Sequence, residues 1–324
     1  MLRVITALFK PSRNVELEFS TLQLLVGFLI AYGLADVNEK VKAQACDALR
    51  DLVATSGSSK DTLDFILPFL EDSLKTGVVD KSSLEELNSD KIFEGTNAAD
   101  NRKEGIVIAL GAAAIHLDNE ESSEKIEETI NMLLSALSTP SESVQSSVAV
   151  CLSKLMKKGN TPKRVEQMLL DLLQECLNGT SLASRRGAAY GISAVVKGSG
   201  IASLKKFDVV KKLEEACSSG SATTKEGALF AIELLSARLG LLFEPYIIVL
   251  LPALLQSFSD TSIHVRSAAK SSVGLVMGKL SGHGVKLLMP AVLEGLESED
   301  WRTKQASIHM LGAMSNCAPK QLGR

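Results

Sequence analysis

The residue types that most often do chemistry in proteins, cysteine and histidine, are scattered along this chain. Zinc sites and Cys–His nucleophiles need these side chains at short or spatially fixed spacings, and no two of the cysteines form a CxxC pair. We therefore expect reduced, mostly buried thiols that act as small apolar groups in helix cores, and neither a metal nor another cofactor. The cysteines are Cys46, Cys151, Cys176, Cys217 and Cys317.

The histidines do not indicate a catalytic site either. His116 and His309 fall late in apolar segments, whereas His264 and His283 lie near turn signals, so no Ser–His–Asp or Cys–His set is indicated. Walker A, GxGxxG, GxSxG and HExxH patterns are absent from the sequence. The sequence therefore predicts a protein that is not an enzyme and has no catalytic residues.

Charge is distributed unevenly, although the net charge is only −3. Residues 76–142 hold 14 acidic and 5 basic residues, whereas residues 154–212 hold 12 basic and 4 acidic residues. A basic face of this kind could contact RNA phosphates or an acidic partner, but the solvated sides of amphipathic helices would look the same. Because aromatic residues are not interleaved with the charges, sequence-specific nucleic-acid binding is not expected. The candidate contact residues are Arg185, Arg186, Lys197, Lys205 and Lys206.

The segments that carry these residues repeat along the chain. Words such as RKEGIVIALGAAA, TKEGALFAIELLS and VRSAAKSSVGLVM begin with a basic or polar residue and continue with small and apolar residues at helical spacing. Apart from the first, the intervals of 61, 42, 40, 40, 41 and 36 lie near the period of two-helix HEAT and armadillo units. The aligned positions are Lys42, Lys103, Gln145, Arg185, Lys225, Arg266 and Arg302.

A second apolar helix precedes each of these segments, and three of these first helices carry a proline: Pro68, Pro252 and Pro290. Glycines recur early in the second helices, as at Gly105 and Gly227. Because glycine weakens a helix by about 1 kcal/mol relative to alanine, its repetition indicates close approach of another backbone. We predict an all-α protein, an α-solenoid of about seven HEAT-type helix pairs.

We predict a single repeat array over residues 1–324. It comprises weakly marked repeats at 15–75, an acidic loop insertion at 76–100 with a short helix at SSLEEL, and well-marked repeats at 101–322. The N-terminal residues lack the features of a signal peptide, and the apolar stretch Leu22–Leu34 is too short to cross a bilayer. We therefore expect a cytoplasmic protein that does not enter membranes.

The last 140 residues resemble a known family. The words RRGAAYGISAVVKGSGIASLKKF (185–207), KEGALFAIELLSARLGLLFEPYIIVLLPALLQSFSD (225–260) and LSGHGVKLLMPAVLEGLESEDWRTKQASIHMLGAMSNCAPKQL (280–322) are similar to the very large HEAT-repeat translational activator of the general amino-acid control pathway. STPSESVQSSVAVCLSKL (138–155) fits the repeat that precedes them. The resemblance is good over residues 130–322 and weak over residues 15–130.

The resemblance implies a non-catalytic scaffold that associates with the ribosome and an ABC-type ATPase partner, in the region leading into the part similar to elongation factor three. It also implies activation of the initiation factor two alpha kinase, through segments that lie outside this chain. The sequence departs from the family in SATTKE at 221–226, in the longer acidic insertion and in the end at Gly323–Arg324, so a fragment of a longer solenoid is expected. An importin-like transport receptor or a phosphatase scaffold remains the alternative.

Overall fold

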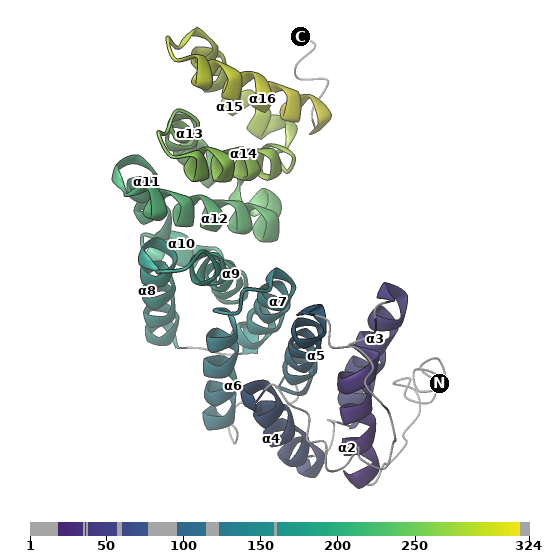
Figure 1. Cartoon of the computed structure of the whole chain (residues 1–324). Coiled ribbons are helices and arrows are strands. Elements are labelled where there is room, and N and C mark those ends of the chain that lie inside the picture. The colour runs from purple at the N-terminus through teal and green to yellow at the C-terminus, as the bar shows by residue number, and fades with distance from the viewer. Residues whose placement is uncertain are drawn as a thin grey trace. The chain divides into compact units, whose positions relative to one another are not determined.

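The computed structural model describes residues 19–34, 36, 38–56, 60–76, 96–114, 123–158 and 161–317, and every regular element within these ranges is a helix. The chain divides into two compact units, Met1–Gly159 and Asn160–Arg324. In each unit the helices follow one another as antiparallel pairs, and the second helix of each pair packs on the second helix of the next (Figure 1). The predicted HEAT-type α-solenoid is confirmed.

The described residues of the first unit form three helix pairs. Its second helices α3, α5 and α7 pack in sequence, and α2 contacts α4. The elements are α2 (Phe19–Phe28), the π-helix η1 (Leu29–Gly33), α3 (Glu39–Ser56), α4 (Lys60–Thr76), α5 (Thr96–Ala114), α6 (Ser123–Ala136) and α7 (Glu142–Lys158).

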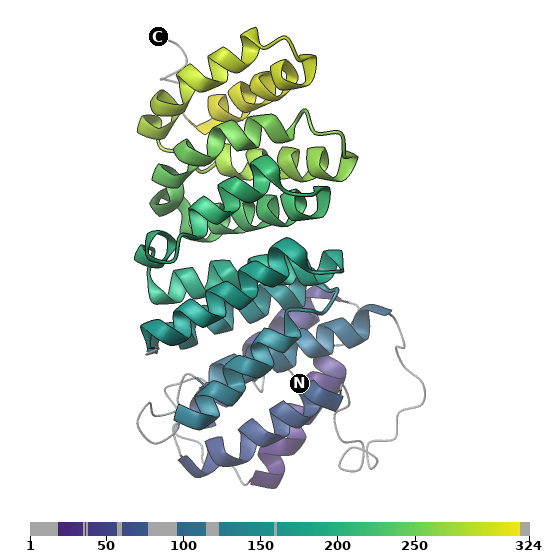
Figure 2. The same cartoon turned by 90° about the vertical axis from the view of Figure 1, so that its left-hand side faces the viewer.

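Residues 161–317 of the second unit form four pairs stacked in two layers. First helices α8, α11, α13 and α15 form one layer, and second helices α9, α12, α14 and α16 form the other (Figure 2). The elements are α8 (Pro162–Asn178), α9 (Leu182–Ser199), the short α10 (Ala202–Lys206), α11 (Val209–Ser219), α12 (Ala222–Leu239), the 3-10 helix η3 (Gly240–Phe243), α13 (Glu244–Ser257), α14 (Ile263–Met277), α15 (Gly282–Glu297) and α16 (Trp301–Cys317).

Serine and threonine residues start many of these helices, as the turn composition predicts. The side chains of Thr161, Ser181, Ser221 and Ser281 each accept a hydrogen bond from the backbone N–H three residues later. Such caps satisfy helix donors that have no partner inside the helix, and each contributes about 1 kcal/mol. The short turns are thus encoded locally, and they fix the antiparallel pairs.

The core between the two layers consists of aliphatic and small side chains. In α9 every residue from Gly187 to Val196 is buried, because α8 and α12 cover this helix. The three predicted prolines lie inside first helices α4, α13 and α15, and each is exposed. The low aromatic content is therefore explained by helices packed closely on helices.

One stretch, Ala222–Ser257, is long and apolar enough by composition to cross a membrane. It is not one continuous rod, since α12 ends at Leu239, Gly240 has a positive φ of 58°, and η3 separates α12 from α13. Its two α-helices pack against α9, α11, α14 and α15. Core helices meet the same criterion, so this stretch is weak support for a membrane span.

The predicted domain boundaries need one correction. Helix α5 begins at Thr96, so residues 96–100 belong to a helix and not to the predicted 76–100 loop. The small residues Ala98 and Ala99 let the helix start before the repeat word RKEG. The short helix predicted at SSLEEL and the histidine His116 lie outside the described residues.

Candidate functional site

In three repeats the residue that sets the repeat register closes the turn within its own helix pair. This glutamine or arginine lies four positions after the N-cap of the second helix and donates to the carbonyl oxygen six residues earlier. Gln145 Nε2 donates to Thr139 O at 2.8 Å, Arg185 Nη1 to Gly179 O at 3.0 Å, and Arg266 Nη1 to Asp260 O at 2.7 Å. The aligned polar residues are therefore structural, because they satisfy buried or half-buried turn carbonyls.

The residue after the register position joins neighbouring pairs where it is acidic. Glu104 Oε2 lies 3.4 Å from Lys42 Nζ in the first unit, and Glu226 Oε2 lies 2.6 Å from Arg185 Nη2 in the second. The side chains of Arg185 and Glu226 are only 7% and 11% exposed. A charge buried this deeply is tolerated only with an opposite charge in contact. We call the contact of α9 with α12 through Arg185 and Glu226 the closed junction.

Glycine follows the acid in both cases and permits the close approach. A Cβ on Gly227 would lie 1.9 Å from the carbonyl oxygen of Cys176, and one on Gly105 would lie 1.7 Å from Leu34 Cδ1. Cys176 Sγ in turn donates to Gly227 O at 3.2 Å. The expectation that repeated glycine marks close packing is met at both positions, by backbone at Gly227 and by a side chain at Gly105.

Arg185 is thus wrong as a surface-contact candidate. Only 6% of the Arg185 surface is exposed, and its guanidinium donates hydrogen bonds to Gly179 O and Glu226 Oε2. Sequence alone could not show this, because a basic residue in a polar helix start looks the same whether a partner acid lies in the next repeat or not. The alignment itself carried the signal, since Lys103 and Lys225 are both followed by Glu and Gly.

The other four candidates do not form one ridge. Arg186 is half-buried at the start of α9, and Lys197 is exposed near its end, about 16 Å away at 1.5 Å per residue. Lys205 and Lys206 are exposed on α10, which packs against α9, and Lys206 Nζ lies 5.2 Å from the centre of the Phe207 ring. Lys197, Lys205 and Lys206 therefore come from two helices in contact, and we call them the α9–α10 lysines.

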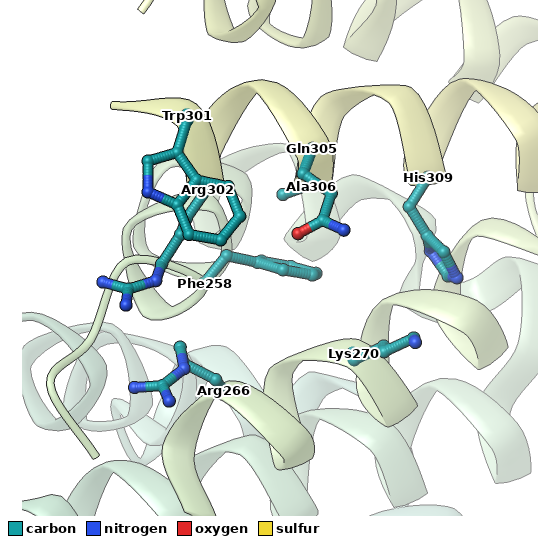
Figure 3. Close-up of a pocket in the computed structure, with 8 residues that line it drawn as sticks. All are labelled: Phe258, Arg266, Lys270, Trp301, Arg302, Gln305, Ala306 and His309. Atoms are coloured by element: carbon teal, nitrogen blue, oxygen red, sulfur yellow. The ribbon is translucent and has the colours of Figure 1, made fainter. Parts of the chain in front are cut away.

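A hollow of about 290 Å³ lies between α14 and α16, and we call it the basic cleft. Arg266 and Lys270 line it from α14, and α16 faces them across it (Figure 3). No carboxylate lines it, whereas two aromatic rings do. The lining residues are Phe258, Arg266, Lys270, Trp301, Arg302, Gln305, Ala306 and His309.

The cations of the basic cleft have few acidic neighbours. Arg266 Nη1 donates to the carbonyl oxygens of Asp260 and Thr261, and the Arg302 guanidinium lies 5.1 Å from the centre of the Trp301 ring. Within the described part of the chain, no ion pair of Lys270 or Arg302 is found. The hollow is therefore an electropositive, partly aromatic surface that suits an anionic group.

The nearest acidic side chains are already engaged in the turns. Burial alone would raise the pKa of Asp260, but hydrogen bonds from Lys225 Nζ and Ser262 N and the charges of Lys225 and Arg266 outweigh it, so that its pKa lies below the ordinary value. The pKa of Asp300 is also lowered, first by a hydrogen bond from Ser259 and then by one from Arg302 N. Both carboxylates stay charged and stay in their turns.

The structure also corrects the register of the last repeat. Lys304 N donates to Asp300 O, as Arg185 N does to Ser181 O, so Lys304 and not Arg302 is the equivalent of Arg185. The buried Ala306 and Ser307 then match the buried Gly187 and Ala188. The sequence alignment was two residues out because the tryptophan–arginine pair imitates the start of the repeat word.

In the corrected register, Gln305 stands where Glu226 stands in the closed junction. Arg266 is equivalent to Arg185, and Gln305 lines the cleft together with it. The two junctions thus differ by an amide in place of a carboxylate and by Ala306 in place of Gly227, and Gln305 is exposed where Glu226 is buried. The sequence analysis did not predict this site. Two features of the sequence could have indicated it: Glu is absent after the last register position, and the single tryptophan lies in the same segment.

The thiols do not offer nucleophiles. Burial raises the pKa of Cys176 and of Cys217 to about 12, and that of Cys151 and of Cys46 to about 11. The thiolate is the reactive form, so these groups are inert at neutral pH. Cys151, Cys176 and Cys217 are buried as predicted, and Cys46 is half-buried. Among the described residues, no group of three His, Cys, Asp or Glu side chains could hold a metal ion.

Comparison with known proteins gives consistent matches. The model of the EF3 N-terminal HEAT repeat family matches residues 185–324. "Stalled ribosome sensor GCN1" of Homo sapiens is 38% identical over 307 residues, which are 94% of this chain and 11% of that protein. "eIF-2-alpha kinase activator GCN1" of Saccharomyces cerevisiae is 33% identical over 310 residues, again 94% of this chain and 11% of that protein.

Among solved structures, the karyopherin Kap121p bound to the extreme C-terminus of the protein phosphatase Cdc14p is similar with a TM-score of 0.48. It is 13% identical, and the match covers 92% of this chain and 30% of the karyopherin. A likeness this low carries no argument, so the importin-like alternative gains no support from it.

Proposed function

The chain is homologous to one segment of the GCN1 family of HEAT-repeat proteins, and from that premise we propose that it is a non-catalytic scaffold in translational control. The homology over 94% of the chain carries the proposal, because the two relatives are named as a stalled ribosome sensor and an eIF-2-alpha kinase activator. Stacked helix pairs present a long surface without a single active centre, which suits a scaffold. The chain spans 11% of each relative, so the proposed role is that of one segment.

We assign the ribosome contact to the α9–α10 lysines. Lys197, Lys205 and Lys206 are exposed, and no ion pair engages them in the described part of the chain. Phosphate contacts by such lysines are independent of nucleotide sequence and weaken steeply with salt. The half-buried Arg186 lies about 16 Å from Lys197 and is left out of this assignment, and Arg185 is excluded from it by burial.

Co-sedimentation with purified ribosomes at low salt tests this assignment. The variant Lys197→Glu/Lys205→Glu/Lys206→Glu is expected to lose most of the sedimenting fraction, and binding of the unmodified chain is expected to fall as salt rises. Arg185 is left unchanged, because a second carboxylate beside Glu226 would unfold the junction and imitate a loss of binding.

The matched control reverses three other exposed lysines of the same unit, Lys163, Lys279 and Lys286. It changes the net charge by the same amount and is expected to leave sedimentation intact. Equal loss in both triple variants would show a nonspecific effect of net charge, and retention by the first variant would refute the assignment.

The remaining parts of the proposal follow the resemblance. We propose a cytoplasmic location, no catalytic activity, an ABC-type ATPase partner, and support of the initiation factor two alpha kinase through the longer protein of which such segments form part. Robust nucleotide hydrolysis by the purified chain would contradict the non-catalytic role. Failure of an ATPase-containing ribosome fraction to retain the chain would contradict that partner.

A further inference from the structure

The basic cleft between α14 and α16 is a repeat junction that lacks its acid. At the closed junction, Glu226 places a carboxylate 2.6 Å from Arg185. At the cleft, the equivalent arginine, Arg266, keeps its turn contact to Asp260 O, but the equivalent of Glu226 is Gln305. The chain therefore leaves the register arginine Arg266 without the carboxylate partner that Arg185 has two helix pairs earlier.

We propose that the basic cleft binds an acidic peptide segment of a partner protein, with one carboxylate taking the place that Glu226 takes at the closed junction. The cations that would face such a segment come from both helices: Arg266 and Lys270 lie on α14, and Arg302 lies on α16. Arginine and carboxylate form charge-assisted hydrogen bonds, which are about twice as strong as neutral ones.

The rest of the lining suits a peptide. The Trp301 side chain is an exposed wall, with 64% of the residue surface open to solvent, and Phe258 supplies a second apolar ring of the lining (Figure 3). An apolar or aromatic side chain of the segment can pack there, since aromatic pairs are stabilised beyond the area that they bury. The Gln305 amide can both donate to and accept from a peptide backbone.

The same features disfavour RNA as the occupant. Single-stranded nucleic acid binds in a groove that tracks its backbone and stacks successive bases on several aromatic rings. Here the cations converge on one hollow of about 290 Å³, whose lining includes only two large aromatic side chains, Phe258 and Trp301. This lining suits one carboxylate and one apolar side chain of a peptide better than a run of stacked nucleotides.

This inference does not depend on the proposed role in translation. It concerns binding by the chain alone, and the α9–α10 lysines lie on other helices. Loss of ribosome binding and loss of peptide binding can therefore be observed separately in the same preparations.

Trp301 is the only tryptophan of the chain and reports on the cleft directly. The test follows tryptophan fluorescence during titration with a synthetic acidic decapeptide of Asp and Glu around a central Phe. We expect a saturable change that weakens with added salt and is reduced when the Phe is replaced by Ala. A lysine decapeptide is expected to leave the emission unchanged.

The decisive variant is Gln305→Glu, which supplies the missing carboxylate from within the chain. We expect it to weaken peptide binding about fivefold or more, because the internal acid competes for Arg266 and its negative charge repels the carboxylates of the peptide. Lys270→Gln, at an exposed position where folding is not at risk, is expected to weaken binding as well. The matched control Gln174→Glu makes the same chemical change on an exposed face of α8 and should bind as the unmodified chain does.

Three results would overturn the proposal. They are unchanged affinity in Gln305→Glu, saturation by an oligouridylate RNA with no response to the acidic peptide, and no response to either probe. Equal weakening in Gln174→Glu would also overturn it, since binding would then follow net charge and not the cleft.

Discussion

The junction of α9 with α12 and the junction of α14 with α16 use the same register positions, yet only the first is closed. Arg185 meets Glu226 at 2.6 Å with both side chains nearly buried, whereas Arg266 and Gln305 line a hollow of about 290 Å³. The second junction has Gln305 in place of Glu226 and Ala306 in place of Gly227, and with the exposed Trp301 beside it the junction stays open. Solenoid repeats can thus keep one fold and change function junction by junction.

The largest expected effect comes from opening the closed junction. Glu226→Gln keeps the side-chain size but leaves the Arg185 charge buried without an opposite charge, so the free energy of unfolding should fall by about 3 kcal/mol. Urea denaturation at neutral pH measures this loss. Glu215→Gln, which removes the acid of the exposed pair Lys211–Glu215, should change stability by less than about 0.5 kcal/mol. Similar losses in both variants would contradict the special status of the closed junction.

The next prediction tests how closely the helix pairs α8/α9 and α11/α12 approach each other at the closed junction. Gly227→Ala would place a Cβ 1.9 Å from the carbonyl oxygen of Cys176, and moving that backbone should cost about 2 kcal/mol. Gly312→Ala in α16 meets nothing within 4 Å and should stabilise the chain by about 0.5–1 kcal/mol through helix propensity. Thermal unfolding of both variants compares the two helices, and a neutral Gly227→Ala would show a looser junction.

A smaller effect concerns Lys225, the register residue of α12. In the next repeat, Ser267 occupies the position equivalent to Glu226, so Lys225 has no glutamate partner there. It pairs instead with Asp260, at 2.8 Å. Lys225→Met should lower stability by about 1 kcal/mol at neutral pH. The pKa of Asp260 is lower in the folded state than in the unfolded state. The ion pair therefore stabilises the fold at pH values above the unfolded-state pKa, and this stabilisation is lost as the pH falls through the folded-state pKa. Unfolding curves of the two proteins should therefore converge in acid, and a pH-independent gap would refute this source of stability.

The smallest effect is the converse of the first. Gln305→Glu should stabilise the chain by about 0.5–1 kcal/mol at low salt, because the cleft is partly open to water and screens the new pair. The gain should shrink as salt is added, which urea denaturation at two ionic strengths would show. A loss of stability would mean that Arg266 and position 305 do not reproduce the geometry of Arg185 and Glu226.

Much of the fold could be predicted because it is written in local patterns. The recurrence of basic, small and apolar residues at helical spacing, with serine caps in the turns, specifies helix pairs without reference to contacts far along the chain. The glycines at Gly105 and Gly227 also gave a correct prediction of close packing, since glycine weakens a helix unless something else needs the space.

The candidate site was harder because exposure depends on the neighbouring repeat. Arg185 and Arg266 are equivalent by register, and only the residue about 40 positions later decides whether each is paired. Net basic content is higher around residues 185–206 than around the cleft, so charge counted along the sequence points to the wrong region for an unpaired arginine. Misplacing the last register at Arg302 also hid the substitution of Gln305 for glutamate.

The sequence by itself determined the α-solenoid, the number of helix pairs and the kinship with translational activators, because periodicity, caps and long shared words act through local structure. Only the tertiary structure decided which basic residues are free to meet a partner. A charge is buried or open according to what the next repeat places against it, and that contact joins residues far apart in the chain. The described cysteines are buried or half-buried and form no reactive site, whereas Gln305, a residue without any catalytic signature, lines the cleft.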